Sequence, residues 1–274
     1  MIIKNHLLKA DPGETIAQRK SPNIGAAMQP DTIVIHYTAG RDAESACDSL
    51  CNPANKASAH LVIGRNGAIT QLVPFNIVAW HAGKSAYGGR SGFNAFSIGI
   101  ELDNAGVLTR AGNSYVAWFG RAYGEQDVIQ AVHRNETTLK YWHRYTEEQI
   151  VLTQKLCEQL IQAYKISSIL GHEEIAPARK IDPGPAFPLD KLRDKLLHPQ
   201  RDGDEEESRI FPIEGGVTAN LLNVRSNPGS HFDKIANPLR RGTKVKILDE
   251  KNGWYKIAVQ TTGWVAKDFV DIIK

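Results

Sequence analysis

The sequence lacks any apolar run long enough to cross a lipid bilayer. A membrane-spanning helix needs about 20 consecutive, mostly apolar residues, and the longest apolar stretches of this 274-residue chain are far shorter. The first ten residues carry lysines within their apolar stretch and no small-residue cleavage site, so they do not form a convincing signal peptide. We therefore expect no membrane span, and either synthesis in the cytoplasm or removal of a leader.

Cysteine and excess charge are scarce as well. Cys47, Cys51 and Cys157 give no disulfide framework, and their odd number indicates reduced, partly buried thiols. Cys47 and Cys51 lie four apart on a predicted helix, 42–50, but as a metal pair they would need further ligands from elsewhere. The chain has 33 Lys and Arg against 30 Asp and Glu and no recognition motif, which argues against nucleic-acid binding.

What the chain does contain is a β-branched run, Asp31-Thr-Ile-Val-Ile-His-Tyr-Thr38, that includes a histidine near its end. Residues 32–35 predict a strand buried on both faces. His36, at the mouth of this strand, needs a polar partner. For one histidine alone, a hydrogen bond within the core is the simpler explanation, and a metal ion is the alternative.

A second polar cluster follows the apolar run Ile169-Leu170, which predicts the end of another buried strand. Residues 171–185 read Gly-His-Glu-Glu-Ile-Ala-Pro-Ala-Arg-Lys-Ile-Asp-Pro-Gly-Pro, and their Gly and Pro residues predict a rigid, irregular loop. This loop carries His172 and Asp182. With His36 they offer two imidazoles and one carboxylate, a set that suits Zn²⁺ and leaves a fourth position open for water, as in catalytic zinc sites.

Four motifs in order make the chain resemble a known family: 33–38 (Ile-Val-Ile-His-Tyr-Thr), 80–83 (Trp-His-Ala-Gly), 97–101 (Ser-Ile-Gly-Ile-Glu) and 172–185. Roughly residues 15 to 195 resemble the zinc-dependent N-acetylmuramoyl-L-alanine amidases of the type-2 family. That family includes phage endolysins, anhydromuramyl-peptide amidases of wall recycling and animal peptidoglycan-recognition proteins. The resemblance implies an α/β fold, with a mixed central β-sheet flanked by helices and zinc at one edge of a groove.

The resemblance also implies roles for individual residues. One Zn²⁺ ion per chain would be bound by His36, His172 and Asp182, with Glu101 as general base and Lys180 stabilising the oxyanion. Zinc lowers the pKa of bound water to about 7, a carboxylate can pass the proton to the leaving amine, and an ammonium can stabilise the tetrahedral intermediate. Two alternatives stay open. Glu101 could form a structural salt bridge, and the adjacent Arg179 could stabilise the oxyanion in place of Lys180.

Four further residues are candidates for contact with the substrate: His60, His81, Arg90 and Asn94. His60 opens the first strand of a predicted hairpin that turns at 65–67, where it could line the cleft without binding metal. His81 belongs to a predicted cleft wall, and a structural hydrogen bond is an equal alternative. Arg90 and Asn94 lie in a Gly-rich loop, where an arginine could pair with a stem-peptide carboxylate or stay solvated.

The rest of this domain divides into a helical part and an aromatic segment. The capping box 146–149 and the apolar residues at helical spacing behind it predict a helix that packs on the sheet, and 190–197 predicts a shorter one. Residues 103–145 contain no conspicuous strand pair and read as an irregular elaboration over the cleft. Its aromatic residues could stack on sugars or bury a small core of their own, and we favour the second role. They are Tyr115, Trp118, Phe119, Tyr123, Tyr141 and Trp142.

A charged segment marks the domain boundary. We expect a catalytic domain over 1–198, an acidic linker over 199–210, which is nearly free of apolar residues, and a second domain over 211–274. Short alternating strands separated by Gly and Asn-Pro turns predict a small all-β barrel there. Its segments 222–229, 253–256 and 263–265 resemble bacterial SH3-like domains, which are common wall-targeting modules.

We therefore expect a peptidoglycan hydrolase that uses zinc-activated water to cleave the amide bond between N-acetylmuramic acid and L-alanine, in peptidoglycan or a muropeptide. It would act on the cell wall, in the periplasm or outside the cell after release or export, as a lysin, an autolysin or an effector. The alternatives are a catalytically inactive peptidoglycan receptor on the same fold and a cytoplasmic amidase that recycles anhydromuropeptides. The full set of implied catalytic residues favours an enzyme over the receptor, and the SH3-like domain favours a polymeric substrate.

Overall fold

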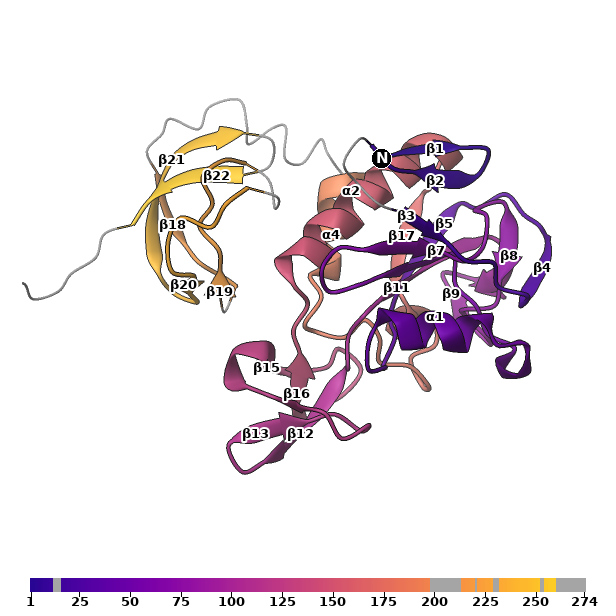
Figure 1. Cartoon of the computed structure of the whole chain (residues 1–274), viewed down its shortest axis with the longest axis horizontal. Coiled ribbons are helices and arrows are strands. Elements are labelled where there is room, and N and C mark those ends of the chain that lie inside the picture. Colours follow the sequence, from indigo (N-terminus) through magenta and orange to yellow (C-terminus); the bar gives the residue numbers. More distant parts are fainter. Residues whose placement is uncertain (12–15, 198–212, 220, 229–231, 252–253, 260–274) are drawn as a thin grey trace, which may run out of the picture. The chain divides into compact units, whose positions relative to one another are not determined.

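The computed structural model describes the chain except for residues 12–15, 198–212, 220, 229–231, 252–253 and 260–274 (Figure 1). The chain divides into two compact units, Met1–Gly203 and Asp204–Lys274. The predicted linker, 199–210, lies outside the described residues. No helix in the described part of the chain is both long and apolar enough to cross a membrane.

A six-stranded mixed sheet forms the centre of the first unit, in the order β17-β5-β11-β6-β7-β3 (Figure 1). The four strands from β17 to β6 run parallel, β7 is antiparallel to β6, and β3 is parallel to β7. The predicted mixed sheet is therefore confirmed, and so is the predicted hairpin at 65–67. The strand bounds are β3 Ile16–Gln18, β5 Thr32–Tyr37, β6 Leu61–Ile63, β7 Ile69–Gln71, β11 Ser97–Leu102 and β17 Ser168–Gly171.

Alternation along the central strands divides their side chains between two faces. One face carries Ile33, Ile35 and their neighbours on β11, and it packs against the main core together with the helices α2 and α4. The other face carries Val34, which packs against Phe93 and Ile175 in a smaller core. His36 and Glu101 share this second face, because they follow the same alternation and are register partners on β5 and β11.

Three longer helices cover the sheet: α1 Ala43–Cys51, α2 Glu147–Tyr164 and α4 Leu189–Leu197. The predicted capping box of α2 is present, because Thr146 Oγ1 accepts from the Gln149 N–H and the Gln149 side chain accepts from the Thr146 N–H. Its apolar stripe is buried as predicted at Leu156, Cys157 and Leu160. α1 begins after the N-cap Asp42 and packs on a separate small core that includes the buried Cys47.

Short elements complete the first unit. Three two-stranded ribbons pair β1 Ile2–Lys4 with β2 Leu7–Lys9, β4 Ile24–Ala27 with β8 Ile77–Ala79, and β9 Ala86–Tyr87 with β10 Arg90–Ser91. A one-turn helix, α3, spans His172–Ile175, and 3₁₀ turns lie at Pro53–Asn55, Phe93–Ala95 and Glu125–Asp127.

The segment 103–145 is not irregular, which corrects the sequence-based expectation. It forms a five-stranded antiparallel sheet in the order β14-β13-β12-β16-β15, hereafter the inserted sheet (Figure 1). The overlooked signal is the pair Gly112-Asn113, a two-residue hairpin connection between Ala111 and Ser114. Its strands are β12 Val107–Ala111, β13 Ser114–Val116, β14 Ala122–Tyr123, β15 Val128–Val132 and β16 Leu139–His143.

The aromatic residues of the inserted sheet have two different environments. Tyr115, Phe119, Tyr123 and Tyr141 pack around a small core that also contains buried Leu108 and Val128, so the interpretation that they bury a core of their own fits them. Trp118 is different, because 77% of its surface is exposed.

The second unit is built from antiparallel strands, in agreement with an all-β fold. A three-stranded sheet, β18-β21-β22, and a two-stranded sheet, β19-β20, enclose a small core that contains Val217, Val245 and Ile247. The predicted segment 263–265 lies outside the described residues. The bounds are β18 Ile213–Gly216, β19 Leu221–Leu222, β20 Leu239–Arg240, β21 Lys244–Lys251 and β22 Trp254–Ala258.

We predict that His143, at the end of β16, makes the first unit sensitive to acid. Burial, reinforced by Arg65 and Arg121, lowers the pKa of this imidazole to about 3, below its ordinary value of 6.5. The folded state therefore favours the neutral ring, so this stability is present above about pH 6.5 and is lost as the pH falls towards 3, by about 1.4 kcal/mol per pH unit. Urea unfolding at pH 7 and pH 5 measures the loss.

His143→Gln provides the comparison, because Gln can still accept the hydrogen bond from the Ala105 N–H that the His143 Nδ1 accepts at 3.0 Å but does not titrate. The variant should lose less stability between pH 7 and pH 5 than the wild type, and His6→Gln, at an exposed position, should behave like the wild type. An unchanged pH dependence in His143→Gln would contradict the prediction.

Candidate active site

Three parallel strands deliver the candidate residues to one edge of the central sheet. His36 lies near the end of β5, Glu101 is its register partner on β11, and His172 follows directly after β17. Because parallel strands end at the same edge of a sheet, side chains far apart in the sequence meet there. The carboxyl edge of β17-β5-β11 is thus the platform of the site.

His172 does not lie in an irregular loop, as its sequence context suggested, but begins the short helix α3. The Glu174 carboxylate accepts a hydrogen bond from the Gly171 N–H at 2.8 Å, which caps this one turn. Pro177 follows shortly after α3 ends. The turn fixes the backbone of His172 at the strand end more firmly than a loop would.

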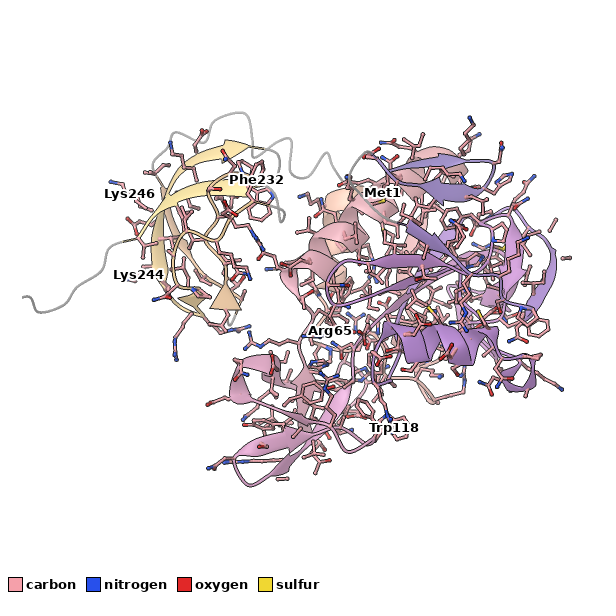
Figure 2. The ribbon with its side chains drawn as sticks, viewed as in Figure 1. Met1, Arg65, Trp118, Phe232, Lys244 and Lys246 are labelled. Atoms are coloured by element: carbon pink, nitrogen blue, oxygen red, sulfur yellow. The ribbon has the colours of Figure 1, made fainter. Side chains whose placement is uncertain are left out.

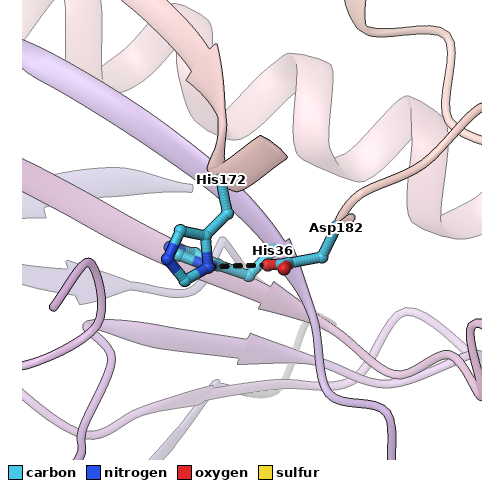
Figure 3. A group of neighbouring side chains, drawn as sticks. All are labelled: His36, His172 and Asp182. Atoms are coloured by element: carbon cyan, nitrogen blue, oxygen red, sulfur yellow. Dashed lines mark hydrogen bonds and ion pairs between the residues drawn. The ribbon is translucent and has the colours of Figure 1, made fainter. Parts of the chain in front are cut away.

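His36, His172 and Asp182 converge on one point (Figure 3). The Nδ1 atoms of both histidines and Oδ2 of Asp182 lie 3.0 Å from one another. All three side chains are buried. The group offers three ligand atoms and could hold a metal ion.

Hydrogen bonds behind the two imidazoles fix which nitrogen carries the proton. His172 Nε2 donates to the Ala82 carbonyl at 3.2 Å, which leaves its Nδ1 without a proton. His81 Nε2 faces the Ser97 carbonyl at 3.2 Å and must donate, so His81 Nδ1 accepts from His36 Nε2 at 3.0 Å. His36 Nδ1 is therefore also a free lone pair.

Protonation equilibria favour the same arrangement. Burial, followed by the neighbouring His172, lowers the pKa of His36 to about 4, so its ring is neutral at pH 7. Burial alone would raise the pKa of Asp182, but the two imidazole rings beside it outweigh burial and hold the pKa below its usual range. Two neutral nitrogens and one ionised oxygen at 3.0 Å repel one another, and a divalent cation between them removes that repulsion. The nitrogen and oxygen donors fit Zn²⁺.

Glu101 is a half-buried residue that lines the same cavity as this group. Burial, and then the charge of Asp182, raise the pKa of Glu101 to about 8, while Lys180 acts in the opposite direction. Its Oε2 is buried and has no hydrogen-bond partner within the described part of the chain. Among the described residues Glu101 forms no salt bridge, so the structural alternative for this residue gains no support.

The two neighbouring cations, Arg179 and Lys180, have different surroundings. Arg179 Nη2 donates to the carbonyls of Ala82 and Lys84 at 2.7 and 2.8 Å, so this guanidinium braces the segment that follows His81. For the Lys180 ammonium, no hydrogen bond or ion pair occurs among the residues that the structure describes. Arg179 and Lys180 both line a cavity of about 390 Å³. The same cavity is lined by Glu101, Trp80 and the group His36–His172–Asp182, hereafter the triad.

Of the four residues expected to contact substrate, His81 lines the cavity, and the contacts that all four make are structural. His60 has no exposed surface; its Nε2 donates to the Ile77 carbonyl and its Nδ1 accepts from the Gly99 N–H, both at 3.0 Å. His81 supports His36 as described above. His81 also lies so close to Gly99 that a Cβ there would come within 2.4 Å of the ring, so glycine is required.

Asn94 and Arg90 each hold a segment of the first unit in place. Asn94 Oδ1 accepts from the backbone N–H groups of His81 and Ala82 at 3.0 and 2.7 Å. The exposed Arg90 forms two hydrogen bonds with the Asp31 carboxylate and lies over the Phe96 ring at 3.8 Å. In this conformation Asn94 and Arg90 hold segments in place, and a direct role in substrate binding stays a prediction.

A buried network of ionic hydrogen bonds around Glu173, hereafter the buried lock, was missed by sequence analysis. It links the inserted sheet to residues 172–184, hereafter the ligand loop, which carry His172 and Asp182. Glu173 Oε2 accepts from His133 Nε2 at 2.7 Å and from the Gly184 N–H at 3.0 Å, and Arg134 Nε lies 3.0 Å from Glu173 Oε1. The Tyr145 hydroxyl donates to the Pro183 carbonyl at 2.7 Å. Both ends of the segment that carries His172 and Asp182 are thus held. His133 lies 40 residues before Glu173 in the sequence, and no local sequence pattern predicts that the two residues pair.

We predict that Glu173→Ala lowers the free energy of unfolding by about 3 kcal/mol, because it leaves buried partners of a charge uncompensated. Asp190→Asn is the matched control: this exposed carboxylate pairs with Arg134 in the same network, and its loss should cost less than about 1 kcal/mol. Thermal or urea unfolding of both variants measures the difference. Equal effects of the two substitutions would show that the buried lock is not the stronger link.

Comparisons with known proteins give matches for both units of the chain. Residues 26–185 match the N-acetylmuramoyl-L-alanine amidase family, and residues 220–271 match the bacterial SH3 domain. Among curated relatives, the 1,6-anhydro-N-acetylmuramyl-L-alanine amidase AmpD of Escherichia coli is 35% identical over 140 residues, 50% of this chain and 57% of AmpD. The N-acetylmuramoyl-L-alanine amidase AmiD of the same organism is 36% identical over 169 residues, 58% of this chain and 51% of AmiD.

The chain therefore spans about half the length of these curated relatives. Among solved structures, a crystal structure of an AmpD derivative covers 70% of this chain at 27% identity, with 97% of that chain covered and a TM-score of 0.48. A complex of Escherichia coli AmiD with the substrate anhydro-N-acetylmuramic acid-L-Ala-D-γ-Glu-L-Lys covers 77% of this chain and 74% of that chain at 28% identity, with a TM-score of 0.45. The match over 26–185 includes more than half of the chain, and the chain belongs to the N-acetylmuramoyl-L-alanine amidase family.

Proposed function

We propose that the protein hydrolyses the amide bond between the lactyl group of N-acetylmuramic acid and the L-alanine of the stem peptide. The observation that carries the proposal is the buried group His36–His172–Asp182, with its three ligand atoms 3.0 Å apart, in a cavity shared with a carboxylate and an ammonium. Membership of the amidase family supports the choice of bond.

The proposed cofactor is one Zn²⁺ ion, held by His36 Nδ1, His172 Nδ1 and Asp182 Oδ2. When bound, zinc supplies Lewis acidity and lowers the pKa of water to about 7, so that a nucleophile exists at neutral pH. The chain itself keeps both Nδ1 atoms free of protons through the bonds of His36 to His81 and of His172 to Ala82.

Glu101 is the proposed proton carrier. Its buried, unpartnered Oε2 is suited to accept the proton of the attacking water, and the protonated carboxyl can then give that proton to the nitrogen of L-alanine as the C–N bond breaks. Burial makes the carboxylate a stronger base than an exposed glutamate. A single residue thus serves both proton transfers, and no other acid is needed in the cleft.

Lys180 is the proposed stabiliser of the charge that develops on the amide oxygen. Its ammonium lines the cavity, and an oriented cation at the position where charge forms lowers the barrier to attack. Arg179, the alternative, already donates to two backbone carbonyls. We therefore assign the oxyanion role to the lysine and a structural role to the arginine.

The same site has two rival explanations. An inactive peptidoglycan receptor would have no use for an unpaired buried carboxylate beside a metal-ligand group, and this disfavours the receptor. A recycling amidase would take soluble anhydromuropeptides, and AmpD, named as a 1,6-anhydro amidase, is similar over half of this chain. The matched bacterial SH3 domain favours a polymeric wall substrate, because a tethered binding module raises the effective concentration of enzyme at an insoluble surface.

We predict opposite metal-binding results for two substitutions at the site. Asp182→Ala should lose tight zinc binding and activity, because two protein ligands remain. Glu101→Gln should keep one zinc per chain and slow turnover by about 10²–10⁴-fold, the usual contribution of a positioned general base. Metal analysis after gel filtration and hydrolysis of a purified muropeptide measure both, and Glu125→Gln, at an exposed position, is the matched control.

Zinc loss in Glu101→Gln would make Glu101 a ligand, and full zinc content with full turnover in Asp182→Ala would remove Asp182 from the site. A wild-type protein that binds zinc and muropeptide but does not cleave it would favour the receptor.

We predict that a chain ending at Gly203, the end of the first unit, keeps its activity on a soluble muropeptide and loses activity on intact sacculi. The reason is that tethering changes the effective concentration of enzyme only at the insoluble substrate. Release of stem peptides from both substrates, at equal enzyme concentrations, measures the ratio. An equal loss on both substrates, with a lower melting temperature, would instead assign a structural role to the second unit.

A further inference from the structure

A second groove, of about 580 Å³, lies beside the catalytic cavity and is lined largely by the inserted sheet. Tyr37 and Ala39 line both hollows, while Val107 and Thr109 of β12 and Val116 of β13 form much of the further wall. We propose that this groove binds an N-acetylated sugar ring of the glycan strand, next to the muramic acid residue whose peptide is cleaved. The proposal rests on the amidase function proposed above and specifies the part of the substrate that lies beyond the scissile bond.

Trp118 is the first reason for this assignment. It lines the groove, and 77% of its surface is exposed. Figure 2 shows where its side chain lies in the first unit. Its Nε1–H donates to the Ala39 carbonyl at 2.7 Å, so the polar edge of the indole is already occupied. What the side chain presents to a ligand is therefore the flat, apolar ring, which suits the apolar face of a pyranose better than a charged or extended group.

Charge is the second reason. None of the described residues that line the groove is charged, whereas the catalytic cavity carries two cations, Arg179 and Lys180, and two carboxylates, Glu101 and Asp182. A stem peptide carries carboxylates, which can pair with a cation such as Lys180 in the cavity but find no cation among the described residues of the groove. A neutral amino sugar has no such preference, and the acetamido methyl and ring C–H groups fit a wall of Ala and Val side chains, with the Tyr37 and Thr109 hydroxyls available for hydrogen bonds.

Rigidity is the third reason. The Tyr37 ring packs on Gly106, just before β12, where φ is +73° and a Cβ would come within 2.7 Å of the ring, so only glycine fits. At the other end, Arg121 Nη1 donates to the Arg41 carbonyl at 3.2 Å, beside the bond from Trp118. The β13–β14 turn is thus fastened to the segment 39–41 that borders the cleft, and the groove is preformed relative to the triad.

The test compares two substrates that differ in sugar number alone: a stem peptide on a single N-acetylmuramic acid, and the same peptide on the inner muramic acid of a four-sugar glycan. The full-length, zinc-loaded protein should prefer the four-sugar substrate in kcat/KM, and Trp118→Ala should reduce this preference about tenfold, mainly through KM. Trp118→Phe, which retains a flat apolar ring, should keep most of the preference. Leu139→Ala removes an exposed apolar side chain of the same sheet that does not line the groove, and it should match the wild type.

Binding of a peptide-free probe, the trimer of N-acetylglucosamine, gives a readout that does not depend on amide cleavage. The wild type should bind it more tightly than Trp118→Ala by a similar factor, in isothermal titration calorimetry with each full-length protein. The proposal would be overturned if Trp118→Ala kept the wild-type ratio of kcat/KM values for the two substrates and bound the trimer as tightly as the wild type. Failure of the wild type to cleave either substrate would instead refute the proposed function.

Discussion

The parallel register of β17, β5 and β11 is the constraint on which the site depends. Pairing Glu101 with His36, and Gly171 with Ile35, brings a carboxylate and two imidazoles to one edge of the sheet. A slip of one residue would turn a strand's side chains to the opposite face. The register is held by the apolar side chains that alternate with the site residues and enter the main core, among them Ile33, Ile35 and Ile100. The core and the chemistry are thus specified by the same strands.

Hydrogen bonds outside the ligand group determine what that group can bind. His36 has a free Nδ1 because His81 is committed to the Ser97 carbonyl, and His172 has one because its other nitrogen meets Ala82. The residues that orient the two imidazoles are themselves held in place. Asn94 holds the backbone of residues 81 and 82, and Glu173 fastens the loop between His172 and Asp182 to the inserted sheet. Residues that never touch the metal position can therefore alter the site.

Much of the fold followed from sequence because its signals are local. The β-branched run before His36, the capping box of α2 and the 171–185 motif each lie within a short stretch, and each predicted the element that the structure contains, apart from the turn of α3. The inserted sheet was missed because its strands are two to five residues long and carry aromatic side chains that obscure the alternation. The His133–Glu173 lock and the environments of His60 and Arg90 depend on contacts between distant segments, so they could not be read from any one of them.

The inserted sheet joins the ligand loop and the cleft border through different edges. Its β15–β16 turn supplies His133 to Glu173, while its β13–β14 turn supplies Trp118 to Ala39. One small sheet therefore braces the metal-ligand loop and forms the wall of an uncharged groove beside the cavity. The two surfaces differ in charge, with cations near Asp182 and none among the described residues of the groove. Such a division matches the proposed substrate, which consists of an anionic peptide and a neutral glycan.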